Sequence, residues 1–334
     1  MNDFFNAIKN NERIGPRVLM LSPTDHCNLS CKICWRLKEA VKFNQPSFNF
    51  LKKIIVEAKE LNVETIDLIG GGEPFLRKDI LKLMGLVKSL GMKGTITTNS
   101  ILIKEDDINT IIKMGWDEIN FSLDGSTPEI NDYIRGRDVF KKVLLKIETF
   151  QRIKRKYNRS KPIIRLSFTI TRTNVNDISN YIKLAKKLGI QNINFSTLFE
   201  WNSNKQFWLS FDKKSVNQIF KKGLRLAKKL DIKTNLEAIT FGNWKHELPK
   251  FCFAPWYMLF INASKEAMLC CTLASLYQNN LGKVNNLKDI WYGKKMEKLR
   301  ENMKNGTFFK ECKMCLPEFT EMFNRIYGEM NDGT

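Results

Sequence analysis

Three cysteines on one short loop are the residues of this chain most suited to metal chemistry. Cys27, Cys31 and Cys34 have the spacing C-x3-C-x2-C within SPTDHCNLSCKICWRL. A [4Fe–4S] cluster usually takes four cysteine ligands, so three thiolates leave one iron open to another ligand. Structural zinc is the alternative, but zinc sites usually come as paired C-x2-C units closed to four ligands. Because the next cysteine is Cys252 and His26 is too close to Cys27 to share an ion easily, the spacing favours the cluster.

A glycine run followed by an acidic residue is the second motif. Gly70-Gly71-Gly72-Glu73-Pro74 follows the predicted strand ETIDLIG, at the carboxyl end where parallel α/β sheets bind ligands. Glycines there let backbone groups approach a ligand closely. Together with the cysteine spacing and Trp35 directly after Cys34, this motif resembles the radical S-adenosylmethionine (SAM) superfamily.

The resemblance implies a cofactor and a set of contacts to it. In this superfamily the amino and carboxylate groups of SAM fill the open iron site, and an electron from the cluster splits SAM into methionine and a 5′-deoxyadenosyl radical. The GGEP match implies that Gly71, Gly72 and Glu73 contact the methionyl amine of SAM. Two further segments resemble those that reach the ribose and carboxylate of SAM, and they contribute Asn99 and Ser122.

The fifth predicted strand adds two candidates. Arg165 and Ser167 share a face by the period of two in a strand, so both are expected to point into the barrel. Arg165 would pair there with the carboxylate of SAM or with an anionic substrate. Hydrogen bonding at the barrel mouth without a ligand is the alternative for these polar residues. Arg135-Gly136, after the fourth strand, is also similar to the family, without an assigned role.

A second group of cysteines lies near the C-terminus. Its pattern resembles the Twitch domain, the shortened form of the SPASM domain, which carries an auxiliary [4Fe–4S] cluster. The resemblance implies one ligand before a Pro-Trp pair, one on a hairpin five residues after a turn glycine, and two in a final C-x2-C; Lys265 replaces the glycine here. The implied ligands, which would fill all four iron sites, are Cys252, Cys270, Cys312 and Cys315. A zinc ribbon is the alternative, because four thiolates also satisfy zinc.

Cys271 is left over by this assignment. Adjacent strand residues point to opposite faces, so Cys271 is expected to face away from the site of Cys270. One interpretation is a buried small hydrophobic residue. The other is a thiol that donates a hydrogen atom to a substrate radical, as in radical SAM epimerases.

Strands that alternate with helices must position these motifs. The glycines at 91, 115 and 189 each follow the last apolar residue of a predicted helix, as a left-handed cap does. The alternation implies a parallel sheet with right-handed crossovers, and six units are too few for a closed eight-stranded barrel. We therefore expect an α/β fold, a partial (β/α)6 TIM-like barrel, which is also the fold of the family. The predicted strands are 18–21, 64–70, 94–99, 118–124, 163–171 and 193–198.

The pattern changes after residue 200. A helix is expected over 213–230 and a short strand near 234–240. Two strands, 257–262 and 267–271, form a predicted hairpin, and a helix near 287–303 follows it. We place a boundary near 240, with the radical SAM partial barrel in 1–240 and a small iron–sulfur domain of β-hairpin plus helix in 241–334.

Composition narrows the class of protein. The chain has 334 residues, 43% of them hydrophobic, and no apolar run comes near the roughly 20 residues that span a bilayer. The N-terminus lacks the features of a signal peptide, and eight cysteines kept for metal fit a reducing compartment, so a cytoplasmic protein is expected. The net charge of +20 is interpreted mainly as a solvated surface, with an anionic substrate or nucleic acid as alternatives.

The sequence predicts a radical SAM enzyme with two [4Fe–4S] clusters. Fewer than thirty residues precede the cysteine loop, which leaves no room for a peptide-recognition domain, so a small hydroxylated substrate is preferred: a sugar or aminocyclitol, oxidised or epimerised. A peptide- or protein-modifying enzyme is the alternative, and a non-catalytic metal-bound nucleic-acid-binding protein is the alternative of another class, against which the SAM motifs argue. An external one-electron reductant of the flavodoxin or ferredoxin type is expected, with the auxiliary cluster as an electron relay. Residues 199–210 and 252–256 are expected to cover the barrel mouth.

Overall fold

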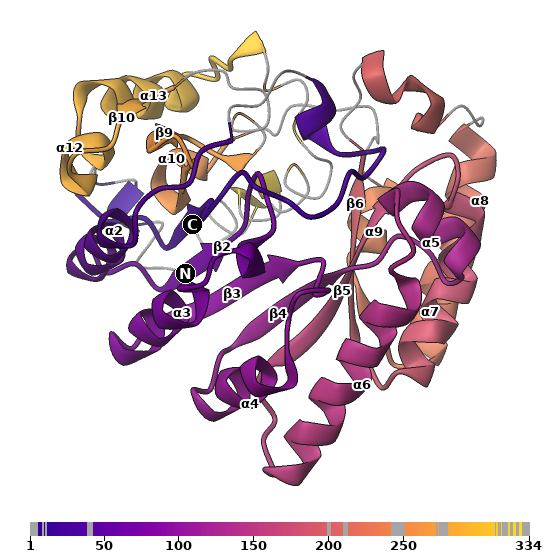
Figure 1. The fold of residues 1–334 in the computed structure, drawn as a ribbon. Helices are drawn as coiled ribbons and strands as arrows, with labels where there is room; N and C mark the ends of the chain where they lie inside the picture. The colour runs from indigo at the N-terminus through magenta and orange to yellow at the C-terminus, as the bar shows by residue number, and fades with distance from the viewer. Residues whose placement is uncertain are drawn as a thin grey trace.

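A sheet of mainly parallel strands is the frame of the chain in this computed structural model (Figure 1). Within the described residues ten strands form one sheet, in the order β10-β9-β8-β1-β2-β3-β4-β5-β6-β7. The strands are β1 (Val18–Leu21), β2 (Thr65–Leu68), β3 (Lys93–Thr98), β4 (Glu118–Ser122), β5 (Ile163–Ile170), β6 (Asn192–Thr197), β7 (Lys233–Thr234), β8 (Met258–Ile261), β9 (Glu266–Met268) and β10 (Gly282–Lys283). The structure describes residues 6–8, 10, 12–38, 43–198, 202–209, 213–241, 251–271, 273, 280–310, 312, 315, 320, 323–324 and 327–328.

Helices follow the parallel strands and cover the outer face of the sheet (Figure 1). The expected α/β partial barrel with a C-terminal β-hairpin is therefore confirmed. The three glycine caps have the left-handed φ that their positions require, between 68° and 75°. No helix in the described part of the chain is long and apolar enough to cross a membrane. The helices are α2 (Phe48–Glu60), α3 (Ile80–Ser89), α4 (Glu105–Lys113), α5 (Pro128–Arg135), α6 (Phe140–Lys156), α7 (Ile178–Lys187), α8 (Lys213–Lys229), α9 (Leu236–Phe241), α10 (Ala254–Tyr257), α12 (Leu287–Trp291) and α13 (Lys294–Lys304), with short 3-10 turns at η1 (Trp35–Lys38), η2 (Pro74–Leu76), η3 (Val175–Asp177) and η4 (Asn202–Phe207).

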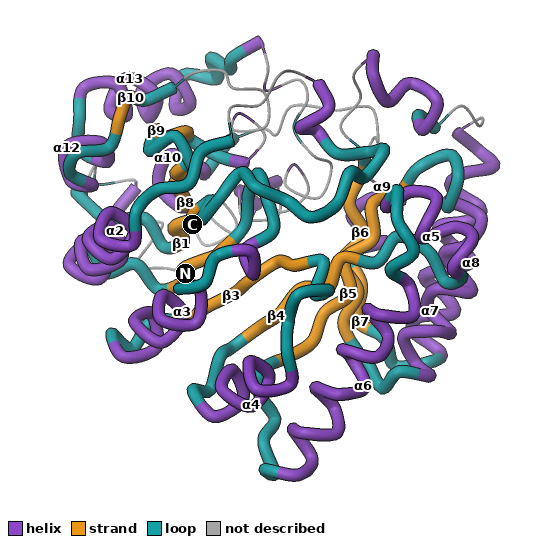
Figure 2. The backbone as a smooth tube through the Cα atoms, viewed as in Figure 1, coloured by secondary structure: helices purple, strands orange, loops and turns teal. Residues whose placement is uncertain are grey.

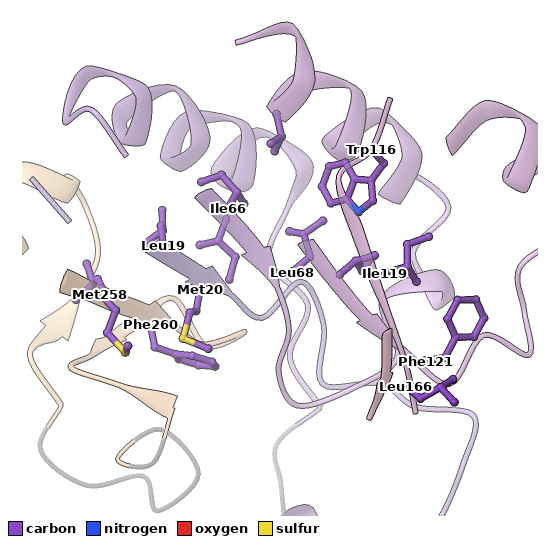
Figure 3. Packing of buried hydrophobic residues seen from close by; sticks show 14 of the residues in the cluster. Leu19, Met20, Ile66, Leu68, Trp116, Ile119, Phe121, Leu166, Met258 and Phe260 are labelled. Atoms are coloured by element: carbon purple, nitrogen blue, oxygen red, sulfur yellow. The ribbon is translucent and has the colours of Figure 1, made fainter. Parts of the chain in front are cut away.

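The two faces of the sheet differ in chemistry because side chains alternate along each strand. Apolar side chains such as Leu19, Ile66 and Trp116 fill the space between the strands and the helices (Figure 3). The other face of β2 to β6 carries half-buried polar residues, among them Asp67, Thr95, Asn120, Arg165, Ser167 and Asn194. The inside of the partial barrel is therefore polar, and a polar ligand can be bound there.

The C-terminal part continues the same sheet. β8 pairs with β1 in parallel, so that Met20 lies opposite Phe260, and β9 and β10 follow in antiparallel pairing. Figure 3 shows Met20 and Phe260 together on the face of the sheet away from Leu19. The boundary near residue 240 stays a prediction, because residues 242–250 lie outside the described part of the chain.

Three elements differ from the expectation, each for a local reason. The strand expected over 234–240 ends at Thr234, because the Asn235 side chain bonds both backbone groups of Phe195 (2.8 and 2.7 Å) and helix α9 begins at Leu236. The helix expected over 287–303 is two helices, because Gly293 is the N-cap of α13. The second hairpin strand ends at Met268, three residues earlier than expected.

Helix α5 was not expected from the sequence. Pro128 occupies the first turn and Gly136 ends the helix with a φ of 70°. Proline at the start and glycine just past the end are the sequence signals that identify such a helix. Both signals are present in this sequence, but a helix of only eight residues gives too short a periodic pattern to be predicted from them.

The hairpin turn gives a first testable prediction. Lys265 has a φ of 65°, a left-handed conformation, at the position where the resemblance to the Twitch domain implies a turn glycine. Because this conformation is strained for a residue with a Cβ, Lys265→Gly should raise the free energy of unfolding by about 0.5–1 kcal/mol. Anaerobic thermal unfolding of the iron-loaded protein measures the change.

Lys283→Gly is the matched control. Lys283 is exposed in β10. A glycine there costs more conformational entropy on folding and relieves no strain, so the Tm of the Lys283→Gly variant should fall. Equal shifts of the two variants in the same direction would contradict the argument.

Candidate cofactor site

The cysteine loop lies directly after β1, at the carboxyl ends of the parallel strands. Figure 2 shows the loops that follow these strands gathered at one end of the sheet. Cys27, Cys31 and Cys34 line a cavity of about 500 Å³ there, together with residues of the glycine run and of the ends of β3 and β4. This volume is within the range of ligand pockets in proteins. The three predicted ligands and the predicted SAM contacts thus share one cavity.

Burial of the thiols bears on what the loop can hold. Burial raises the pKa of Cys34 to about 11, and burial also raises the pKa of Cys27 above its ordinary value. Both thiols therefore stay protonated at neutral pH unless a cation replaces the proton, and thiolates are the ligands of iron–sulfur clusters. Within the described residues no group of three or more His, Cys, Asp or Glu converges as a single ion would require. The thiol-only donor set fits an iron–sulfur cluster.

The glycine run packs against the cysteine loop itself. A Cβ on Gly70 would lie 2.3 Å from Ser22 Oγ, one on Gly71 2.2 Å from Asp25 Oδ1, and one on Gly72 2.0 Å from the backbone oxygen of His26. Gly71 N donates to Ser22 Oγ, at 3.1 Å. These glycines also line the cavity, so the close approach to a ligand stays a prediction, while the close contacts that the structure shows are with the preceding loop. The run therefore fixes the position of the thiols.

Glu73 ties the second and third loops together. Its carboxylate, in a residue only 2% exposed, accepts hydrogen bonds from Thr98 Oγ1 (2.6 Å) and Asn99 N (2.7 Å). Burial raises the pKa of Glu73 in spite of these bonds. Asn99 Nδ2 in turn donates to Asn28 Oδ1 in the cysteine loop, at 2.8 Å. Glu73 and Asn99 thus join the loops after β1, β2 and β3 around the cavity.

Of the residues on β4 and β5 that were predicted to contact SAM, only one lines the cavity. Ser122, at the end of β4, lines the cavity, but Arg165 and Ser167 do not. Arg165 lies opposite Asn120 in β5, and its Nη2 pairs with Glu118 Oε2 at 2.8 Å, in the first half of the strands. Arg135, to which the sequence assigned no role, lines the cavity instead. The signal available in the sequence was the Arg135-Gly136 pair after the fourth strand, which is similar to the family.

The five C-terminal cysteines surround one small cavity. Cys252, Cys270, Cys312 and Cys315 line a void of about 30 Å³, and so does Cys271. Burial, and next the neighbouring Cys270, raise the pKa of the Cys252 thiol well above its ordinary value. The expectation that Cys271 faces away from Cys270 was based on strand alternation, and it is wrong because β9 ends at Met268, before either cysteine. This second thiol-rich set also fits a cluster.

The segments expected to cover the mouth are described only in part, and Phe207 packs in a cluster that Ile33 of the cysteine loop also contacts. Phe207 in η4 is 1% exposed and packs with Ile134 of α5, and Trp208 donates to Asn204 Oδ1. Trp256 is 5% exposed and stacks on Phe251. Residues 199–201 and 210 lie outside the described part of the chain, so coverage of the mouth stays a prediction.

Comparisons with known proteins agree with this geometry. Residues 21–160 match the radical SAM superfamily, and residues 252–316 match the SPASM iron–sulfur cluster-binding domain. The chain belongs to the radical SAM superfamily. This radical SAM enzyme carries a C-terminal SPASM domain, and its cofactors are SAM and [4Fe–4S] clusters.

The chain is similar to proteins of several kinds. Fe-coproporphyrin III synthase of Methanosarcina barkeri is 31% identical over 180 residues, which are 53% of this chain and 43% of that protein. The matches thus span about half the length of such relatives. Streptococcus suis SuiB bound to its precursor peptide SuiA has a TM-score of 0.70 and 20% identity over 93% of this chain and 73% of that one. The anSMEcpe structure with AdoMet and the Kp18Cys peptide has a TM-score of 0.65 and 18% identity, with coverage of 92% and 88%.

Iron content tests the division of the cysteines into two sets. Anaerobic reconstitution should give about eight irons per chain, from two cubes of four. Joint replacement of Cys27, Cys31 and Cys34 by Ala should leave about four irons and abolish SAM cleavage. Iron analysis and SAM turnover give the answer. Zinc in the C-terminal site, or unchanged iron in the triple variant, would refute the assignment.

A second measurement separates Cys270 from Cys271. Cys270→Ala should lose about four irons, because one cube lacks a ligand, whereas Cys271→Ala should keep all of them. Since Cys271 lines the auxiliary cavity and not the SAM cavity, its variant should also form 5′-deoxyadenosine and the normal product. A changed product with full iron content would identify Cys271 as the hydrogen-atom donor, and the reverse pattern of iron loss would mean that the two cysteines exchange roles.

Proposed function

We propose that this radical SAM enzyme modifies a peptide. The observation that carries the proposal is the similarity, over more than nine-tenths of the chain, to two solved structures that hold a peptide, SuiB and anSMEcpe. The likeness itself is one of fold, and the peptides belong to those proteins. It nevertheless favours a peptide over the small hydroxylated substrate preferred from the sequence, since that preference rested on the length of the N-terminal segment alone.

The cavity contains what such a reaction needs from the protein. When bound, the cluster and SAM supply a radical that removes a hydrogen atom from an unactivated carbon of the substrate. Cys27, Cys31 and Cys34 would hold that cluster, while Glu73 and Asn99 keep the surrounding loops closed on one another. Trp35 and Phe43 line the same cavity, where they are available to contact a substrate. Phe43 is 62% exposed, so an apolar contact is available to an incoming side chain.

Charge at the cysteine loop supports an anionic or acidic peptide. Lys32, Arg36 and Arg137 lie on or beside the loop, and Arg137 is exposed. The whole chain has 55 Lys and Arg against 35 Asp and Glu. Basic surroundings raise the local concentration of an acidic partner and steer its approach.

The auxiliary cluster has a separate role in this proposal. Its four implied ligands would leave no iron open to substrate, which fits a role in electron transfer.

The source of the abstracted hydrogen tests the proposal. The reconstituted enzyme is incubated with SAM, dithionite and a library of short acidic peptides made with deuterated side chains. Deuterium should appear in 5′-deoxyadenosine, because the hydrogen atom moves from substrate to the adenosyl carbon. Mass spectrometry of the nucleoside and of the peptide measures both products.

Deuterated sugars and aminocyclitols are the competing substrates in the same assay. The triple Cys27, Cys31 and Cys34 variant supplies the background without the cluster. Deuterium transfer from a sugar or aminocyclitol but from none of the peptides would overturn the proposal.

A further inference from the structure

The end of helix α5 holds the cysteine loop by its backbone. Lys32 N donates to the backbone oxygen of Ile134 at 2.9 Å, and Arg137 Nη1 donates to that of Asn28 at 3.0 Å. Gly136 passes so close that a Cβ there would lie 2.6 Å from Ser30 O. Because these contacts reach the loop at residues 28, 30 and 32, they fix its register against α5.

Arg135, the last residue of α5, points from this junction toward a thiol. Its Nη2 pairs with Asp124 Oδ2 at 2.7 Å, and its Nη1 lies 3.9 Å from Cys31 Sγ. The side chain is only 13% exposed. Its Nε is buried and has no hydrogen-bond partner among the described residues. Arg135 thus places a buried positive charge between a carboxylate and a predicted cluster ligand.

Asp124 is itself held in place by hydrogen bonds to neighbouring elements. Its side chain is 1% exposed, and Oδ1 accepts a hydrogen bond from Thr169 N at 2.8 Å, while Asp124 N donates to Asn131 Oδ1 at 2.9 Å. An arginine guanidinium keeps its charge in proteins. This one cannot move away from the loop without breaking its buried pair with Asp124.

Two other charged groups face the same thiols. Arg36 interacts with Cys27 and Cys34, and the buried Glu73 faces Cys27. The Arg36 guanidinium lies over the Phe43 ring, at 5.4 Å. Arg36 interacts with the Asp25 carboxylate only at longer range, and within the described residues no salt bridge holds it as Asp124 holds Arg135. Arg135 is the cation whose position the fold determines from both sides.

We propose that the Asp124–Arg135 pair raises the reduction potential of the cluster on the cysteine loop. One-electron reduction, by the external donor, adds one negative charge to the cluster and its thiolates, and no bond forms or breaks. Net charge and hydrogen bonds to the sulfurs set the potential of such clusters. The pair is a largely buried dipole whose positive end faces Cys31, so it stabilises the reduced state more than the oxidised state. Asp124 acts as a positioning residue, through Arg135. The inference does not rest on the proposed substrate.

The midpoint potential of the loop cluster tests this inference. Anaerobic redox titration of the iron-loaded enzyme, followed by EPR, should show that Arg135→Gln reduces about tenfold the ratio of reduced to oxidised cluster at a fixed potential, a fall of ~59 mV for a one-electron couple. The signal that SAM perturbs belongs to the loop cluster, because only that cluster has an iron open to SAM. Arg135→Lys, which restores the charge, should recover most of the loss.

Arg152→Gln is the control. It also removes one positive charge, but Arg152 is exposed in α6 and pairs with Glu105 rather than with the cysteine loop, so the potential of this variant should equal that of the wild type. Arg135→Met is the second charge-removing variant, should Arg135→Gln fail to take up iron. An unchanged midpoint in whichever of the two Arg135 variants takes up iron, with or without weaker SAM binding, would overturn the proposal. A fall of the same size in Arg152→Gln would overturn it as well.

Discussion

The close backbone packing between the loops after β1 and β2 is the constraint on which the cofactor site depends. Gly70, Gly71 and Gly72 lie where any Cβ would overlap the segment from Ser22 to His26. Two parallel neighbours in the sheet can bring their loops this close only if one of them has no side chains at the contact. The thiols that follow His26 are thereby placed by main-chain geometry rather than by flexible side chains. Preorganisation of this kind suits a cluster whose ligands must all be present at once.

A chain of buried polar contacts extends this constraint around the cavity. Glu73 joins β2 to the end of β3, Asn99 joins β3 to the cysteine loop, and Arg135 joins α5 to the same loop. Each link crosses from one βα unit to another. A buried polar group without a partner is costly, so each residue holds its neighbour in one arrangement. The loops after β1, β2 and β3 are therefore each joined to the other two, although the barrel itself is open.

Much of this architecture could be predicted from the sequence, and the failures have physical causes. The alternation of strands and helices, the glycine caps and the two cysteine sets depend on local patterns, and the fold and the cofactors follow from them. The two-residue period of a strand places Arg165 on the inner face, as the structure does. The period does not say how far along the strand a residue lies from the cavity. Arg165 pairs with Glu118 in the first half of the strands, away from the cavity at their carboxyl ends. The strand assumed to carry Cys271 ends at Met268, and Asn235 replaces a strand pairing with its side chain. Strand ends that are set by tertiary contacts leave no periodic pattern in the sequence.

The parallel pairing of β8 with β1 means that the iron–sulfur domain cannot be treated as a detachable appendage. β1 is the strand that leads into the cysteine loop, and its residues Leu19 and Leu21 are fully buried. A chain truncated before β8 would leave β1 as the edge of the sheet, with unpaired backbone groups beside an apolar strand. Edges of that kind pair with other chains. Gain or loss of this domain during evolution therefore requires a replacement cover for β1, and shortened relatives must protect that edge in some other way.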